Sequence, residues 1–262
     1  MGFPLALLDP GAWPTFVFVT ARLTGLMLTA PLWSMTAMPR TVRAAVTVVL
    51  ALLLTPLAPR VTLPDQLLEL PMPLALELVL GIGIGLAAAV LVQGASLAGE
   101  VISLQMGLSL GPALASVPEL EVPSVGQLQS LLALFIYVAV GGHLVLLRGL
   151  AESLHTLPPA SALDLAGGAD LAARLGGALF TSALGAAAPV MVTLLLVNVA
   201  LAILARAVPQ LNAMMVSLPL TIGVGLLMLG LALPLLAAAV AGWMHGLPAG
   251  VAGVTAAFRP RP

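Results

Sequence analysis

A charge-free run of 22 residues, Leu78 to Gly99, most constrains what this chain can fold into. About 20 apolar residues of helix cross the hydrocarbon core of a bilayer, so the run predicts a membrane-spanning helix. Its small and polar residues recur at steps of three, four, seven or eight and therefore share one helical face. They are Gly81, Gly85, Gln93, Ser96, Glu100, Ser103 and Gly107. Such a face points toward a protein interior or a wet path, since lipid or other apolar helices surround the rest of the helix.

The helical pattern stops after Gly107, where glycine and proline become frequent. Gly111, Pro112, Pro118 and Pro123 exclude a continuous helix. Non-helical backbone at membrane depth is tolerated only where protein or a cavity covers it. A spanning helix with an inward polar face that runs into an interrupted apolar loop is typical of a channel or transporter element.

Composition extends this prediction to the whole chain. Apolar residues make up 61% of it and charged residues 7%, and the mean hydropathy is +1.17. So few charges could not cover that much apolar surface in water. We predict an all-α integral membrane protein with about six hydrophobic segments, forming a single membrane-embedded domain over residues 1–262 without a soluble domain. The net charge of -1 and the scattered arginines give no footprint for nucleic acid.

The other apolar segments are interrupted or unusual in length. The second is only 16 residues, which suggests a half-buried hairpin arm, and prolines are expected to kink or interrupt the last two segments. The stretch from Gly149 to Arg174 looks wet, and the charge bias of the loops is weak. These features favour a chain that packs into an assembly as broken helical hairpins. The segments are Thr15–Met35, Ala44–Pro59, Ser124–Leu147, Leu175–Ala205 and Ala207–Phe258.

Polar residues inside these segments are the candidate functional residues, because each is costly at membrane depth. Arg22 either snorkels to an interface or forms an inward-facing ion pair. The stripe Gln93, Ser96, Glu100 and Ser103 either lines a conducting path or bonds to neighbouring helices. We interpret the remaining ones as structural or assembly residues: Glu77, Gln105, His143, Asn198, Arg206, Gln210 and Asn212.

Patterns that would indicate catalysis are scarce. The chain has no lysine and no cysteine, and His143, His155 and His245 show no metal-binding spacing. In the GIGIG run, the third glycine of a dinucleotide fingerprint would fall on Leu86, so close helix packing is the better interpretation. We therefore predict no enzymatic activity and no cofactor.

Several segments, taken together, resemble the FliR/SctT family of type III secretion export-gate proteins. The QxGLS piece and the RxxPQxN piece are the most telling, and the similarity extends in order along essentially the whole chain. The segments are AGEVISLQMGLSLG (98–111), GGHLVLLRGLAESLHTLP (141–158), APVMVTLLLVNVALAILARAVPQLN (188–212) and SLPLTIGVGL (217–226).

The resemblance implies a partner set and a location. A family member builds the export gate with FliP and FliQ, FlhB wraps onto the gate, and FlhA acts below it. The gate lies in the bacterial inner membrane at the flagellar basal body, and unfolded flagellar subunits pass through it. An injectisome gate subunit is the nearest alternative, and composition alone would also permit an autonomous secondary transporter or channel.

The resemblance also implies that the loop after QxGLS plugs the resting pore. In this sequence the loop is residues 106–122, and it lacks the phenylalanine that many members carry there. Closure would therefore depend on methionine and aliphatic side chains, which can exclude water from a narrow pore. The candidates are Met106, Leu108, Leu110, Leu114 and Val117.

Overall fold

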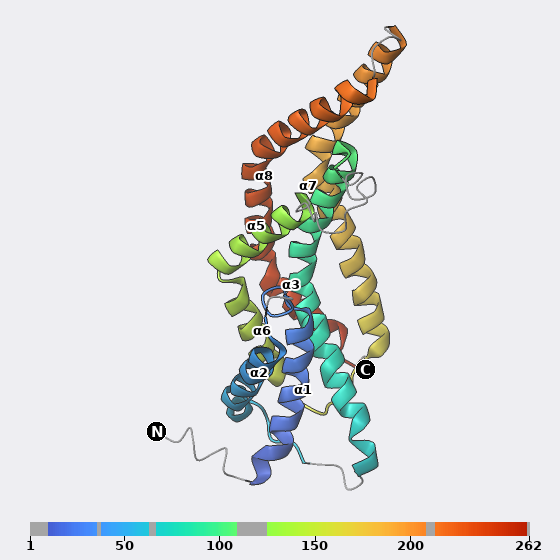
Figure 1. Cartoon of the computed structure of the whole chain (residues 1–262). Helices are drawn as coiled ribbons and strands as arrows, with labels where there is room; N and C mark the ends of the chain where they lie inside the picture. The colour runs from blue at the N-terminus through green and yellow to red at the C-terminus, as the bar shows by residue number, and fades with distance from the viewer. Residues whose placement is uncertain (1–9, 36–37, 63–66, 109–124, 208–212, 261–262) are drawn as a thin grey trace. The chain divides into compact units, whose positions relative to one another are not determined.

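The computed structural model describes residues 10–35, 38–62, 67–108, 125–207 and 213–260. Within these ranges the chain is helical and no strand occurs (Figure 1). Short 3₁₀ turns at Pro10–Ala12, Thr55–Leu57 and Leu67–Glu69 flank the longer helices. The helices are α1 (Trp13–Thr29), α2 (Arg40–Leu54), α3 (Pro71–Met106), α5 (Val125–Ala139), α6 (Gly142–Thr156), α7 (Leu165–Ala207) and α8 (Ala213–Ala257).

The predicted all-α membrane architecture is confirmed. Among the described residues, four helical stretches are long and apolar enough to cross a membrane: Arg40–Leu57, Pro71–Met106, Leu165–Ala207 and Met215–Ala257. The pair α5 and α6 forms a fifth candidate, bent by 63° at its break. With the 17-residue α1, these helices account for the six predicted apolar segments.

The helix breaks only partly follow the sequence pattern. The fourth apolar segment, Ser124 to Leu147, is divided between α5 and α6 at Gly141, whose φ of 78° lies in the left-handed region that ends a right-handed helix. The expected prolines do not interrupt the last two helices, since α7 continues through Pro189 and α8 through Pro219, Pro234 and Pro248. A proline removes only one backbone donor, so a long apolar helix keeps enough bonds on either side to continue. Whether these prolines kink the helices stays a prediction.

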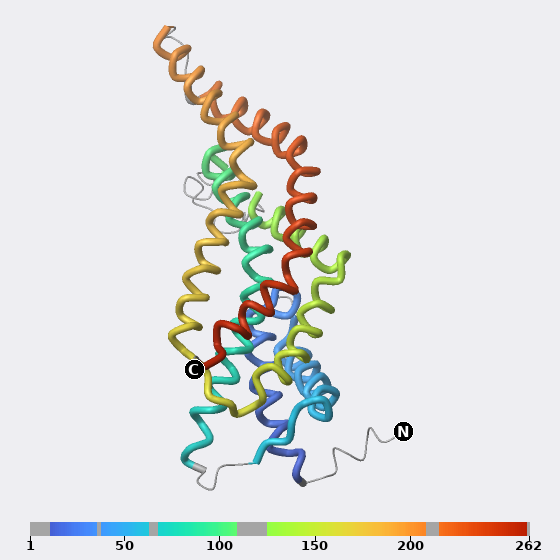
Figure 2. Tube along the Cα trace, turned by 180° about the vertical axis from the view of Figure 1, so that it is seen from behind, coloured from blue at the N-terminus to red at the C-terminus, as the bar shows by residue number. Residues whose placement is uncertain are grey.

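The chain divides into two compact units. Unit 1 comprises Met1–Val90, Tyr137–Gly177 and Trp243–Pro262, and unit 2 comprises Leu91–Ile136 and Ala178–Gly242. The helices α3, α7 and α8 each contribute residues to both units. The view from behind traces these three helices along the chain (Figure 2). In unit 1, α1 and α2 pack directly against each other. The single domain expected from the sequence stays a prediction.

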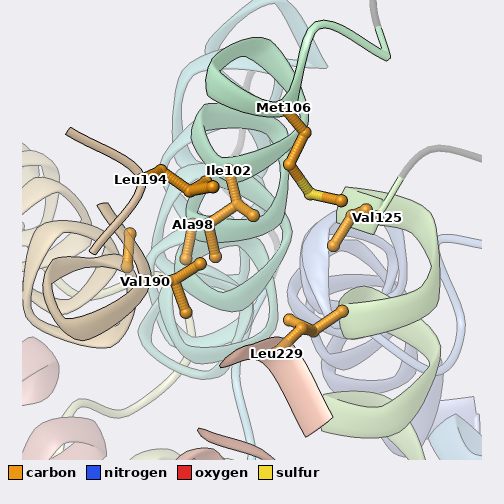
Figure 3. Packing of buried hydrophobic residues seen from close by; sticks show 8 residues of the cluster. Ala98, Ile102, Met106, Val125, Val190, Leu194 and Leu229 are labelled. Atoms are coloured by element: carbon orange, nitrogen blue, oxygen red, sulfur yellow. The ribbon is translucent and has the colours of Figure 1, made fainter. Parts of the chain in front are cut away.

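Unit 2 is held by an apolar cluster from four helices. Met106 extends from the end of α3 toward Val125 at the start of α5, while residues of α7 and α8 close the other sides (Figure 3). In a membrane the alternative to this contact is lipid and not water, so such side chains hold the helices together through close van der Waals packing. The buried members are Ala98, Ile102, Met106, Val125, Ala187, Val190, Leu194 and Leu229.

The end of α3 is fixed by Gly107, in agreement with the predicted end of the helical pattern. Gly107 has a φ of 76°, its N–H donates to the Leu104 carbonyl at 3.1 Å, and the Leu108 N–H donates to the Ser103 carbonyl at 3.1 Å. These two bonds form a Schellman cap, which requires a left-handed residue after the last helical one. Gly107 therefore sets where the chain leaves the helix and enters the loop.

We predict that Gly107→Ala destabilises the protein by about 1–2 kcal/mol, because a side chain penalises the left-handed conformation. The control is Ala160, a non-glycine residue held at a φ of 62°. Because glycine adopts this conformation without steric strain, Ala160→Gly should not lower the stability of the protein. Thermal unfolding midpoints in detergent would check both variants, and a Gly107→Ala midpoint equal to the wild-type value would contradict the cap.

Candidate functional site

The most strongly determined polar site is a buried ion pair between α1 and α3 in unit 1. Arg22 has 0% and Glu77 2% of its surface exposed. The Arg22 Nε atom donates to Glu77 Oε2 at 2.6 Å. Of the two interpretations that the sequence left open for Arg22, the inward-facing ion pair is therefore correct. Snorkelling to an interface is excluded because the whole side chain is covered.

The rest of the guanidinium group is satisfied by α6 and the segment that follows it. Arg22 Nη1 donates to Ser153 Oγ at 3.0 Å, and Nη2 donates to the Leu157 carbonyl at 2.9 Å. Ser153 Oγ in turn donates to the Leu150 carbonyl at 2.6 Å. The rigid, planar donor set of arginine suits this arrangement, which a lysine ammonium could not reproduce.

Glu77 completes the network with its second oxygen. Its Oε1 accepts a hydrogen bond from the backbone N–H of Ala160 at 3.0 Å. Ala160 is in the left-handed region, a conformation that costs a non-glycine residue about 1–2 kcal/mol and persists only where the surroundings determine it. The Arg22–Glu77 pair thus ties together α1, α3, α6 and the segment between α6 and α7.

Three glycines let α1 and α3 approach closely enough for this pair to form. A Cβ atom on Gly25 would overlap the Leu78 carbonyl oxygen, and one on Gly81 would overlap the Arg22 carbonyl oxygen. A Cβ atom on Gly85 would overlap Thr29 Oγ1, which donates to the Ile82 carbonyl at 3.2 Å. The helix-packing interpretation of GIGIG is confirmed for Gly81 and Gly85, since small residues allow two backbones into contact.

The polar stripe of α3 does not share one environment. Gln93 and Glu100 are exposed, Ser96 is half-buried and Ser103 is buried. Ser103 Oγ accepts the Val125 N–H at 3.1 Å, so this hydroxyl caps the first turn of α5. A Cβ atom on Gly126 would come within 2.8 Å of the Ser96 carbonyl oxygen and 2.7 Å of Glu100 Cγ. Whether Gln93 and Glu100 line a path stays a prediction.

The described candidates for the plug lie in the core of unit 2. Met106 is fully buried, and a Cβ atom on Gly225 of α8 would stand 2.6 Å from its Cγ atom. Thr221 Oγ1 lies 3.4 Å from the Met106 carbonyl oxygen, and Leu108 packs against the apolar cluster. The other three candidates, Leu110, Leu114 and Val117, lie outside the described residues. The plug assignment stays a prediction.

The remaining assembly candidates are distributed over both units. Asn198 and Arg206 are exposed on α7, while Gln210 and Asn212 lie outside the described residues. Gln105 Oε1 and His143 Nδ1 are buried atoms without a hydrogen-bond partner among the described residues. Buried polar groups are normally bonded, so these two atoms are exceptions, but the chain itself covers them and a neighbouring subunit could not reach them in this conformation. The structural or assembly role of these residues stays a prediction.

Sequence reasoning missed Ser153, Leu157 and Ala160 as parts of the site. They lie in the stretch from Gly149 to Arg174, which was expected to be wet. The expectation is confirmed for the exposed Glu152, His155 and Arg174, but it was wrong for Ser153 and Leu157, which are 0% and 3% exposed. The helical spacing of Leu146, Leu150, Ser153, Leu154 and Leu157 could have revealed this buried face.

Comparison with known proteins gives the family. Residues 13–247 match Bacterial export proteins, family 1. The chain belongs to this family. It is 33% identical to the flagellar biosynthetic protein FliR of Pectobacterium carotovorum over 222 residues, covering 84% of this chain and 85% of that protein. It is 36% identical to the Escherichia coli FliR over 141 residues, 53% of this chain and 54% of that protein. The Bacillus subtilis FliR is 34% identical over 145 residues, 54% of this chain and 56% of that protein.

Family membership makes the chain a component of the flagellar export apparatus and identifies it as a membrane-embedded export protein. The buried pair lies inside the matched region, and its partners come from widely separated parts of the chain. Among the described residues, no group of His, Cys, Asp and Glu is arranged to hold a metal ion. The observed site is an anchor between helices.

We predict that Glu77→Leu destabilises the protein by about 3–5 kcal/mol, because it leaves the Arg22 guanidinium buried without its counter-charge. The double variant Arg22→Leu/Glu77→Leu should be less damaging than either single variant, since it removes both charges. Arg174→Ala is the control, because the Arg174–Asp170 pair is 77% and 56% exposed. Thermal unfolding midpoints in detergent would rank the stabilities of these variants. A Glu77→Leu midpoint equal to that of Arg174→Ala would contradict the role of the ion pair as an anchor between helices.

Proposed function

We propose that this chain is a non-enzymatic subunit of the flagellar type III protein export gate, in the inner membrane at the flagellar basal body. It assembles there with FliP and FliQ, contacts FlhB and FlhA, and helps to form the pore through which unfolded flagellar subunits are exported. The observation that carries the proposal is the family match over residues 13–247, together with the similarity to FliR proteins.

The surface of the chain supports an assembly role. In α3, 56% of the most apolar stretch is buried, but the corresponding shares are 17% in α7 and 22% in α8. Large apolar side chains such as Leu196 and Ile203 of α7 and Leu231 of α8 are more than three-fifths exposed. Exposed apolar surface on this scale must be covered by lipid or by other proteins. A gate subunit surrounded by partner subunits would meet that need.

The loop that follows α3 is proposed to plug the closed gate. Met106 and Leu108 anchor the start of the loop to the α8 side of unit 2, and the Gly107 cap fixes the direction in which the chain leaves α3. The aliphatic residues of the loop would hold the pore dry in the resting state.

Co-expression tests the assembly proposal. We expect the tagged chain to be unstable alone and to form one mixed complex with FliP and FliQ from the same organism, because α7 and α8 lack a cover in the isolated chain. Native mass spectrometry would give the composition of the particle. A homogeneous particle without partners would instead favour the autonomous transporter or channel.

Deleting residues 109–122 tests the plug. This deletion leaves Met106 and the Gly107 cap in place, so we expect the gate to assemble but the membrane to leak small ions, because the apolar barrier is missing. A potential-sensitive dye in cells would measure the leak. A Gly/Ser segment of equal length should also leak, whereas restoration of the seal by that segment, or unchanged conductance in the deletion variant, would remove the plug assignment.

A further inference from the structure

A groove between α1 and α2 in unit 1 combines two arginines with an apolar wall. It has a volume of about 550 Å³, within the range of pockets that bind small molecules. Arg40 and Arg43 line it together with Thr20, Thr24 and Thr47, and no acidic side chain is among its described lining residues. Its apolar part is formed by Met27, Leu28, Ala44 and Val48.

The cationic end of the groove is not neutralised within the described protein. Arg43 donates from Nη2 to the Met35 carbonyl at 3.2 Å, and among the described residues neither Arg40 nor Arg43 forms an ion pair. Two like charges that line one groove repel each other unless an anion lies close to both. An anion from outside the chain would supply that charge.

The helix terminus adds positive charge at the same place. Arg40 is the first residue of α2, no side chain caps this terminus and no acidic residue lies in its first turn. Uncapped N–H groups and the helix dipole favour an anion at a helix N-terminus, and the two arginines add positive charge to this end of α2. The combination favours an anionic ligand.

The hydroxyl groups limit what the ligand can be. Thr20, Thr24 and Thr47 donate to the carbonyl oxygens of Phe16, Thr20 and Arg43 at 2.7, 2.7 and 2.8 Å. Their protons are used within their own helices, which leaves the guanidinium groups as the donors facing the groove. Arginine can bind phosphate oxygens through two parallel bonds, so a phosphate group fits these donors.

We propose that this groove binds the phosphate group of an anionic phospholipid, with an acyl chain along Met27, Leu28 and Val48. The candidate span begins at Arg40, so the arginines lie at the depth of lipid headgroups while the apolar wall extends toward the hydrocarbon core. Basic pockets between membrane helices commonly hold such headgroups. The proposal does not depend on the export function.

The test is lipid retention by the purified full-length chain, with its co-expressed partners where they are needed for stability. The protein is exchanged into nanodiscs of phosphatidylcholine with phosphatidylglycerol, and bound lipid is counted by native mass spectrometry. Arg40→Gln/Arg43→Gln should retain about tenfold less phosphatidylglycerol, since both guanidinium contacts are lost. Arg43→Lys should retain an intermediate amount, because it keeps the charge but not the planar donor set.

Matched controls separate this site from general charge effects. Arg148→Gln/Arg174→Gln removes the same charge from exposed positions and should retain phosphatidylglycerol like the wild type. Inorganic phosphate at equal concentration should not displace the lipid. The proposal would be overturned if both double variants retained equal amounts of phosphatidylglycerol, or if the protein retained phosphatidylcholine equally well. Displacement of the lipid by free phosphate would also overturn it, as would a cross-link from position 43 to an acidic residue of a partner. If the groove double variant does not fold, Arg40→Gln, which changes an exposed side chain, decides by the same readout.

Discussion

A guanidinium group buried in an apolar interior must have its charge and its donors satisfied, and the structure of unit 1 follows from that requirement. Arg22 reaches a carboxylate on α3, a hydroxyl on α6 and a carbonyl after α6. An isolated buried charge is far more costly than a paired one. The helices that supply these partners therefore cannot be displaced independently. One residue fixes the relative positions of elements that are more than 130 positions apart in the sequence.

The second constraint is the closeness of α1 and α3. Glu77 can meet Arg22 because Gly25, Gly81 and Gly85 remove the side chains that would hold the two backbones apart. The same helix then serves unit 2, where Ala98, Ile102 and Met106 pack into the apolar cluster and Ser103 caps α5. The first part of α3 therefore contacts α1 closely, whereas its last part caps α5 and packs into the apolar cluster.

What the chain leaves uncovered is as informative as what it buries. The apolar faces of α7 and α8 need lipid or protein around them, and the groove lined by Arg40 and Arg43 carries positive charge without an acidic partner among the described residues. These are two different incomplete surfaces, one apolar and one cationic, and they call for different occupants. Partner subunits of an export gate suit the first, whereas the phosphate of a lipid suits the second.

The sequence by itself determined the class of the protein, because composition and the length of charge-free runs decide whether a chain can exist in water. It also located the end of α3 at Gly107, since the wheel pattern and the glycine coincide there, and its resemblance to the FliR/SctT family agreed with the family found by comparison. It could single out Arg22 and Glu77 as costly residues but could not pair them, because 55 residues of chain separate them and periodicity reports only on neighbours within one helix. It also could not show that the polar stripe divides into exposed and buried parts. Only the tertiary structure decided these points, because the partner of a buried charge and the cover of a helix face are set by which distant segments pack together.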